Sequence, residues 1–284
     1  MSHEGVNILD WIGREQVAED TITIAPLVSL SATLDRDDPT PREGDALPPL
    51  WHWLYFLPRT AMRDVGSDGH AKLGGFLPPL SLPRRMWAGS RVTFVHAPRV
   101  GESVRRVSRI VDVIEKTGSS GQLVFITVQH DTFTPRGLAI SESQDLVYRT
   151  LPSSGSATAA APTETAAPST FSRAITPDPV LLFRYSALTF NSHRIHYDRR
   201  HATDVEGYPG LVVHGPLIAT LLLDLLRREK PEARVRTFTF KAQRPLFDTA
   251  PFSVHGHADS STNYRLWALD PLGQPAVQAS ATIE

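Results

Sequence analysis

The sequence predicts an α+β protein made of two repeats, each a long helix wrapped by a curved antiparallel sheet. Two regions of the chain alternate apolar and polar residues with a period of two, which is typical of half-buried strands. A low-complexity segment, residues 152–170, separates these regions and divides the chain almost evenly. The two regions also resemble each other at a constant offset of 146 residues. Together these observations favour an internal duplication joined by a linker.

The domain boundaries follow from the low-complexity segment. Ala, Pro, Ser and Thr dominate residues 152–170 and no large apolar side chain occurs there, so we expect a linker rather than core. The N-terminal repeat then spans residues 1–151 and the C-terminal repeat spans residues 171–284. At the offset of 146, Phe94 in the first repeat matches Phe240 in the second.

Composition excludes several classes of function. The formal net charge is -1, so no general attraction to nucleic acid or to an anionic membrane is expected. The chain has no cysteine, which excludes disulfides, thiolate metal ligands and a cysteine nucleophile. The first residues lack the basic and apolar segments of a secretory signal, and no apolar stretch is long enough to span a bilayer. We therefore expect a soluble cytoplasmic protein.

The N-terminal third is the least regular part of the sequence. Residues 7–20 are predicted as a short helix capped by Asn7, and residues 22–34 as a strand leading into a helix. Residues 35–49 are polar and proline-rich, so they form a long loop, which is often functional. The aromatic residues of 50–57 either pack in the core or form a wall over an acyl chain or adenine. An extended surface segment is expected up to residue 83.

Strand signals begin at Arg91 and recur after the linker. Alternating segments bounded by turn residues predict an antiparallel meander in each repeat. The expected strands are residues 92–95, 104–114, 123–133, 138–148, 235–242, 252–258, 264–269 and 276–283.

A long apolar helix is predicted to begin at Pro216. Proline suits a first helical position, leucines recur at helical spacing after it, and Pro231 ends the pattern. The N-terminus of this helix offers free backbone N–H groups beside His214 and Gly215, where a negative oxygen is stabilised.

A polar cluster precedes this helix and follows an apolar segment. It consists of Asn191, Ser192, His193, Arg194, His196, Tyr197 and Asp198. A solvated loop would be the simplest explanation. However, a base beside a site for an oxyanion is the minimum requirement for enolate chemistry on a thioester.

The spacing of these residues resembles a known family. Asn191, His196 and Asp198, followed by His214-Gly215, resemble the motif of the MaoC-like, hot-dog-fold enoyl-CoA hydratases (hydratase 2). The phrases TFNSHRIHYD, LPPLWHWLYFLP and LPRRMWAG resemble a subgroup with the type 2 hydroxyacyl-thioester dehydratases and bacterial hydratases of small dicarboxylic acyl-CoAs.

The resemblance implies a double hot-dog fold and a hydro-lyase that works on a CoA thioester without metal or redox cofactor. The implied reaction is hydration of itaconyl-CoA or mesaconyl-CoA to citramalyl-CoA. A 3-hydroxyacyl-thioester dehydratase of fatty acid synthesis and a noncatalytic acyl-CoA-binding protein stay open as alternatives. Because two repeats in one chain could pair their sheets internally, the oligomeric state stays open between a monomer, a homodimer and a larger homo-oligomer.

The resemblance assigns the catalytic roles. His196 is the candidate acid and base, since imidazole titrates near working pH. The Gly215 N–H is the candidate donor to the thioester oxygen. Asn191 stands where the family has an aspartate, and an amide cannot accept a proton. Asn191 could orient the water, or its presence could mean lost activity. Asp198 either assists or is structural.

Cations are the candidate substrate-binding residues. Arg84 and Arg85, beside Trp87, could hold phosphate and stack on a base, or could form a solvated turn. Arg194 could bind a substrate carboxylate or a CoA phosphate, or form an internal salt bridge. A free substrate carboxylate would need one of these arginines.

Three further residues complete the set of candidates. His214 flanks the helix start, and Arg244 lies where the family often has a basic residue near the CoA entrance. His255 shares a strand face with a second histidine two residues on, but without a matched carboxylate no metal site is expected.

Overall fold

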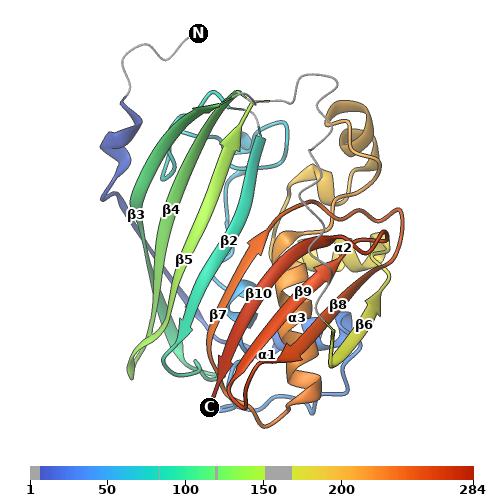
Figure 1. The fold of residues 1–284 in the computed structure, drawn as a ribbon. Helices are drawn as coiled ribbons and strands as arrows, with labels where there is room; N and C mark the ends of the chain where they lie inside the picture. Colours follow the sequence, from blue (N-terminus) through green and yellow to red (C-terminus); the bar gives the residue numbers. More distant parts are fainter. Residues whose placement is uncertain (1–6, 83, 119–120, 151–167) are drawn as a thin grey trace.

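The fold is one antiparallel sheet of ten strands with helices on one side (Figure 1). The computed structural model describes residues 7–82, 84–118, 121–150 and 168–284. The sheet order is β1-β3-β4-β5-β2-β7-β10-β9-β8-β6. The strands are β1 (Glu15–Thr21), β2 (Arg84–Phe94), β3 (Ser103–Gly118), β4 (Gly121–Thr134), β5 (Gly137–Arg149), β6 (Phe171–Ile175), β7 (Val235–Ala242), β8 (Phe252–Ala258), β9 (Asn263–Leu269) and β10 (Pro275–Ile283).

The sheet is symmetric about the junction of β2 and β7. Each strand of the first repeat has a counterpart at the same distance from this junction in the second. At the junction Val92 pairs with Phe238, and these numbers differ by 146. Equivalent residues of two repeats face each other in this way when a two-fold axis passes between them. The register therefore agrees with the duplication expected from the sequence.

The predicted long helix is present in the second repeat. It is α3, Gly215–Glu229, and it lies behind β8 and β9 (Figure 1). Pro216 is in its first turn and Lys230 is its C-cap, as the sequence indicated. Ten consecutive side chains, from Leu217 to Leu226, are buried. Two shorter helices, α1 (Ile24–Thr33) and α2 (Pro179–Leu188), follow the edge strands of the two repeats.

The first repeat lacks a counterpart of α3 within its described residues. Between α1 and β2 it has an irregular segment with only two 3-10 turns, Trp51–Leu54 and Met62–Asp64. The expected long helix in each repeat is therefore correct for the second repeat and wrong for the first. Proline and glycine recur along this segment, which prevents a continuous helix.

Two local predictions near the N-terminus are corrected. Residues 7–20 contain a 3-10 turn, Ile8–Trp11, capped by Asn7 as expected, but the rest is strand β1 rather than helix. Tertiary pairing overrides the local pattern here, because β1 completes the sheet beside β3. Strand β2 also begins at Arg84 and not near Arg91, so the arginine pair belongs to the sheet.

The remaining strands agree with the sequence to within a few residues, and β6 and α2 were not predicted. Most of the linker, residues 152–167, lies outside the described residues, while Phe171 opens β6. Among the described residues, no helix is both long and apolar enough to cross a membrane.

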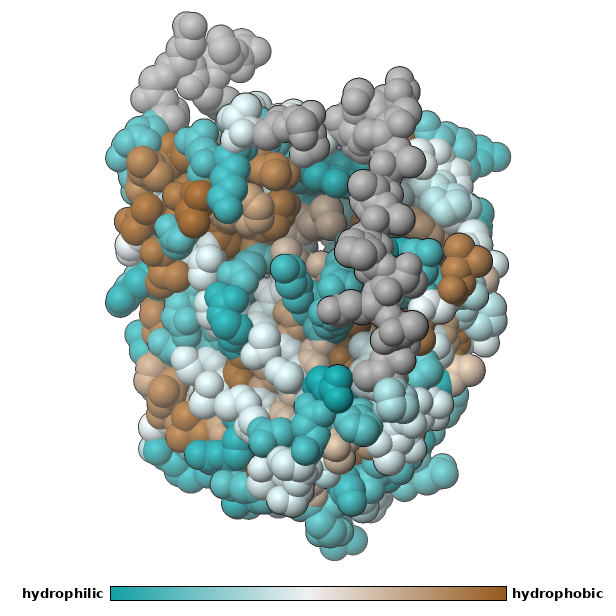
Figure 2. Space-filling model, in the orientation of Figure 1, coloured by the Kyte–Doolittle hydropathy of each residue, from teal (hydrophilic) through white to brown (hydrophobic). Residues whose placement is uncertain are grey.

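The interior has two apolar clusters. The larger cluster joins α1, α2 and α3 to both halves of the sheet. The smaller cluster lies between β3, β4 and β5 and the segment 73–82, which packs over them. Figure 2 shows that hydrophobic side chains also gather on the outer face at the upper left, over the part of the sheet where Figure 1 places β3 and β4. Val111 and Ile114 of β3 are exposed. Leu73, Leu80 and Leu82 of this first-repeat segment also line the cavity described below.

Candidate active site

The polar cluster forms a compact turn between α2 and α3. The side chain of Asn191 accepts a hydrogen bond from the backbone N–H of His193 (3.0 Å), and its own backbone N–H donates to Ser186 O (2.8 Å). A 3-10 turn, Arg194–His196, follows and buries His196. The amide oxygen of Asn191 therefore organises the turn, a role that the sequence did not indicate.

Imidazole rings from both repeats form a row through this turn. The ring centroids of His70 and His193 are 3.9 Å apart, and those of His193 and His196 are 5.4 Å apart. His196 stacks on His214 at 3.7 Å. The sequence indicated three of these rings, whereas His70 comes from the first repeat and was missed.

His196 is held in one tautomer. Its Nδ1 lies 2.7 Å from the carbonyl oxygen of Val212, which can only accept, so Nδ1 carries the proton. Burial lowers the pKa of His196 to about 4. The ring is therefore neutral at pH 7 and its Nε2 keeps a lone pair. This arrangement can accept a proton from water.

The N-terminus of α3 lies next to the histidine row. His214 is the N-cap residue and is fully buried, with Nε2 bonded to the hydroxyl of Ser186 at 2.8 Å. The ring of His214 stacks on His196, so it supports that ring, and its expected binding role stays a prediction. A Cβ on Gly215 would meet only the carbonyl oxygen of Trp87, at 3.9 Å. Space is therefore open at the helix start, where backbone N–H groups favour an anion.

A loop of the first repeat docks on this turn. The carbonyl oxygen of Asp68 accepts from the Arg194 N–H (2.9 Å), and Arg194 also donates to Ser67 O. Gly69 has φ +92°, and a Cβ there would lie 1.8 Å from the carbonyl oxygen of Ser192. Only glycine allows this approach. The Asp-Gly-His sequence was the available signal for the loop, but no local pattern connects it to a site about 125 residues away.

Asp68 and His70 form a hydrogen-bonded pair in this loop. Asp68 Oδ2 lies 2.8 Å from His70 Nδ1, and Asp68 Oδ1 accepts from the His70 backbone N–H at 3.0 Å. Burial would raise the pKa of Asp68, but the hydrogen bond from His70 outweighs it and holds the pKa well below its ordinary value. Burial lowers the pKa of His70, although the bond to Asp68 opposes it. The pair therefore consists of a carboxylate and a neutral imidazole.

Potential metal-ligating atoms also meet here. One atom each from Asp68, His70 and His193 lies within 4.8 Å of the others. The direct hydrogen bond between Asp68 and His70 already accounts for their proximity, because a proton occupies the side of His70 that faces the carboxylate. We assign the group to hydrogen bonding.

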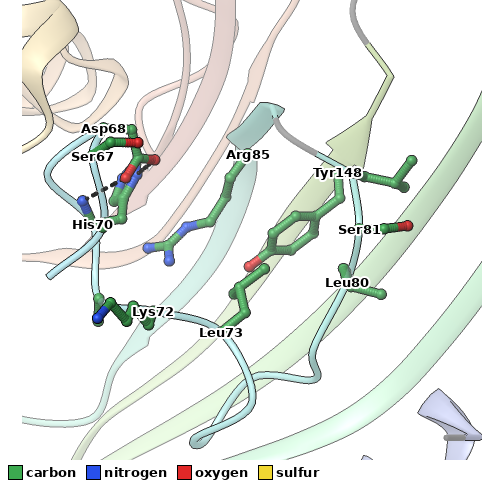
Figure 3. A pocket seen from close by; sticks show the side chains of 12 residues that line it. Ser67, Asp68, His70, Lys72, Leu73, Leu80, Ser81, Arg85 and Tyr148 are labelled. Carbon is green, nitrogen blue, oxygen red and sulfur yellow. Dashed lines mark hydrogen bonds and ion pairs between the residues drawn. The ribbon is translucent and has the colours of Figure 1, made fainter. Parts of the chain in front are cut away.

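A small cavity adjoins the loop (Figure 3). Its volume is about 220 Å³, and Arg85, Tyr148, Asp68, His70 and Lys72 are among its lining residues. In Figure 3, Arg85 lies between the Asp68–His70 pair and the ring of Tyr148. His70 belongs both to the histidine row and to the lining of this cavity, whereas His196 and Gly215 do not line it.

The three candidate arginines differ in their partners. Arg84 pairs with Glu206 (3.3 Å) and Arg194 pairs with Asp198 (2.7 Å). Asp198 also accepts from the His201 N–H, which makes it structural. Among the ion pairs of the described residues, none includes Arg85. Arg85 is thus the candidate that keeps a free cation beside the cavity.

Two other binding candidates are engaged elsewhere. Trp87 packs edge to face against Trp53 and donates its indole N–H to Gly89 O and Ser90 Oγ, so its ring is not placed to stack on a base. Arg244 contacts Gln274 and Asp270, which favours the structural alternative over a role at a CoA entrance.

The pair His255 and His257 has ordinary partners. His255 stacks on Trp267 and bonds to Ser253, while His257 bonds to Thr170. These two rings belong to no candidate metal group among the described residues.

Comparison with known proteins identifies the fold class. The chain superposes on HtdX of Mycobacterium tuberculosis with a TM-score of 0.67 at 17% identity, covering 94% of this chain and 99% of that one. A second protein of that organism, described as having a double hot-dog fold, gives a TM-score of 0.58 at 14% identity, covering 99% of both chains. The expected double hot-dog fold is therefore confirmed.

The sequence identifies the family. The model of the hydroxyacyl-thioester dehydratase type 2 family matches residues 50–248. The chain is also 46% identical to the mesaconyl-C(4)-CoA hydratase of Chloroflexus aurantiacus, over 96% of both sequences. This chain belongs to the hydroxyacyl-thioester dehydratase type 2 family, and it is an enzyme of the hydratase and dehydratase class.

Proposed function

We propose that this enzyme adds water to mesaconyl-C4-CoA, or to its isomer itaconyl-CoA, and forms citramalyl-CoA. The C. aurantiacus relative supports a substrate of this kind. The observation that carries the proposal is Arg85, a guanidinium without an acidic partner in the described ion pairs, at the wall of a small cavity beside the histidine row. Such a substrate has a free carboxylate in addition to its thioester.

Arg85 and Tyr148 together suit a carboxylate. The hydroxyl of Tyr148 is buried near the Arg85 guanidinium. Burial raises the pKa of Tyr148, and Arg85 opposes this rise. A substrate carboxylate between Arg85 and Tyr148 would accept from both groups. Hydrogen bonds to a charged group are the stronger kind.

The size of the cavity favours a short acyl group. Pockets for drug-sized ligands measure roughly 300–1,000 Å³, and this cavity is smaller, at about 220 Å³. Its lining includes the cationic side chains of Arg85 and Lys72. A dehydratase of long fatty acyl thioesters is therefore less well supported.

The residues suit each step of the hydration of mesaconyl-C4-CoA, whose double bond is conjugated with the thioester. His196 Nε2 takes a proton from water as the water oxygen bonds to the β-carbon. The electrons of the double bond move towards the thioester oxygen, where the Gly215 N–H stabilises the enolate. The enolate then collapses, the α-carbon takes the proton back from His196, and the ring is neutral again.

Strand β2 relates Arg85 to the start of α3. Arg85 and Trp87 point to the same face of the strand, and the backbone of Trp87 adjoins Gly215. The same short stretch of β2 therefore carries Arg85 and adjoins the start of α3.

The test compares three thioesters with purified wild-type enzyme and two variants. Mass spectrometry would follow water addition to mesaconyl-C4-CoA, itaconyl-CoA and crotonyl-CoA. We expect Arg85→Gln to lower kcat/KM for the dicarboxylic substrate about tenfold to a hundredfold and to leave crotonyl-CoA hydration unchanged. Arg84→Gln, whose parent side chain already has an acidic partner, is the matched control.

Two results would contradict the proposal. Hydration of crotonyl-CoA alone would indicate a fatty acyl dehydratase. Saturable binding of all three thioesters without turnover would indicate an acyl-CoA-binding protein.

A further inference from the structure

The side-chain oxygen of Asn191 already has one partner within the turn. The water that attacks the β-carbon has two hydrogens, and His196 Nε2 can accept only one of them. The amide oxygen of Asn191 is bonded to the His193 N–H, and an amide cannot take up a proton at working pH. A neutral imidazole with a free nitrogen would be a more basic second acceptor for this water.

His70 has the required free atom. Its Nδ1 faces Asp68, so Nδ1 carries the proton and Nε2 keeps a lone pair. The ring lies against that of His193 at a tilt of 40°, and His193 in turn lies edge to face with His196. His70 also lines the cavity with Arg85. The positive charge of Arg85 is close enough to contribute to the lowered pKa of His70.

The substrate places its β-carbon near the same point. In mesaconyl-C4-CoA the free carboxylate is bonded directly to the β-carbon. If Arg85 holds this carboxylate, the carbon that accepts water lies one bond from the carboxylate, and His70 lines the same cavity as Arg85 (Figure 3).

We propose that His70, oriented by Asp68, is a second catalytic residue whose Nε2 accepts a hydrogen bond from the attacking water. His196 and His70 then hold the water by its two hydrogens and aim its oxygen at the β-carbon. One proton passes to His196 and returns to the α-carbon, while the other stays on the new hydroxyl group. Asp68 is a positioning residue, because it fixes the tautomer of His70. The inference rests on the proposed hydration of a dicarboxylic thioester.

The test uses variants that change His70 or its tautomer. His70→Gln removes the ring, and we expect kcat for mesaconyl-C4-CoA to fall about 10²-fold or more with little change in KM. Asp68→Asn keeps the shape, but its amide would donate to Nδ1 and force the proton onto Nε2. We therefore expect a loss of similar size. His255→Gln, on the far strand β8, is the matched control with unchanged kcat.

Rescue separates catalysis from structure. Asn191→Asp adds a carboxylate oxygen to the turn, so we expect it to restore part of the kcat lost in His70→Gln. A purely structural role of His70 would give no rescue. If His70→Gln fails to fold, Asp68→Asn still tests the role of His70. This change keeps the size of the side chain and alters only the tautomer of His70.

Three outcomes would overturn the inference. In an active wild-type enzyme, a His70→Gln variant with normal kcat would exclude the role of His70 and leave the proposed function intact. Activity that disappears with a chelator and returns with zinc would indicate a metal at this loop instead. A wild-type enzyme without turnover of any of the three thioesters would overturn the proposed function as well.

Discussion

Behind β8 and β9 the second repeat carries the continuous helix α3, whereas the first repeat has an irregular segment between α1 and β2. The two repeats keep the same strand order around the β2–β7 junction. They differ in what they present to the site. The second repeat supplies His196 and a helix N-terminus, and the first supplies the Asp68–His70 loop and Arg85.

The difference indicates that two repeats of one fold can contribute different groups to a single site. Loss of the long helix in the first repeat leaves a segment that is free to dock against the other repeat, as residues 66–70 do on the Ser192–Arg194 turn. We expect changes in the second repeat to remove the base or the donor to the thioester oxygen. Changes in the first repeat should affect how the attacking water is held and which substrate is preferred.

The largest effect is expected from His196→Ala in the second repeat. Removal of the base should lower kcat by about 10²–10⁴-fold, measured as water addition to mesaconyl-C4-CoA. His255→Ala in the same repeat should retain normal kcat, because that ring bonds to Ser253 and stacks on Trp267, away from the histidine row. Near-normal kcat in a folded His196→Ala enzyme would move the chemistry to the first repeat.

The first repeat is tested by Gly69→Ala. The new Cβ would collide with the Ser192 carbonyl, so the loop must move away from the turn. A displacement of about 1 Å can cost about 10²-fold in rate, and we expect kcat to fall by about that factor. Gly13→Ala is the control, since its φ is +86° but nothing lies within 4 Å of the new Cβ. Equal losses in both variants would mean that backbone strain alone is responsible.

A smaller effect is expected at the start of α3. Gly215→Ala should fold normally, because the nearest atom to the new Cβ is 3.9 Å away. The methyl group would occupy the space where the thioester approaches, so kcat/KM should fall about tenfold without a change in Tm. Gly75→Ala, with open space around its Cβ, is the control. An unchanged kcat/KM would argue that the thioester oxygen binds elsewhere.

The smallest effect concerns pH and stability. Burial lowers the pKa of His196 and of His130 to about 4, compared with about 6.5 in an unfolded chain. Between these values the unfolded chain binds protons that the folded protein does not. The free energy of unfolding should therefore fall as the pH falls from about 6.5 to about 4, by up to about 1.4 kcal/mol per pH unit for each such histidine.

Thermal unfolding at a series of pH values measures this slope. Replacement of His130 by Gln removes one of the two groups, so the dependence of Tm on pH should become shallower. His255→Gln serves as the comparison, because that ring is only partly buried. A Tm that rises on acidification through this range would contradict the prediction.

Much of the fold could be predicted because it is encoded locally. A period of two marks β3, β4 and β5, and the leucine spacing after Pro216 marks α3. The offset of 146 residues matches Val92 with Phe238, and these two residues pair at the centre of the sheet. The strand and helix signals need only neighbouring residues. Strand β1 was misread because its pairing with β3 depends on residues far along the chain.

The site was only half determined by the sequence. Asn191, His196 and Gly215 lie within one short segment of the sequence, so their chemistry could be proposed from spacing and resemblance alone. The choice among the arginines could not be made, because Arg84 finds Glu206 and Arg194 finds Asp198 only in the folded chain. The Asp68–His70 pair meets His193 for the same reason. Tertiary structure decides which charges are neutralised and which stay free, since their partners lie on separate elements.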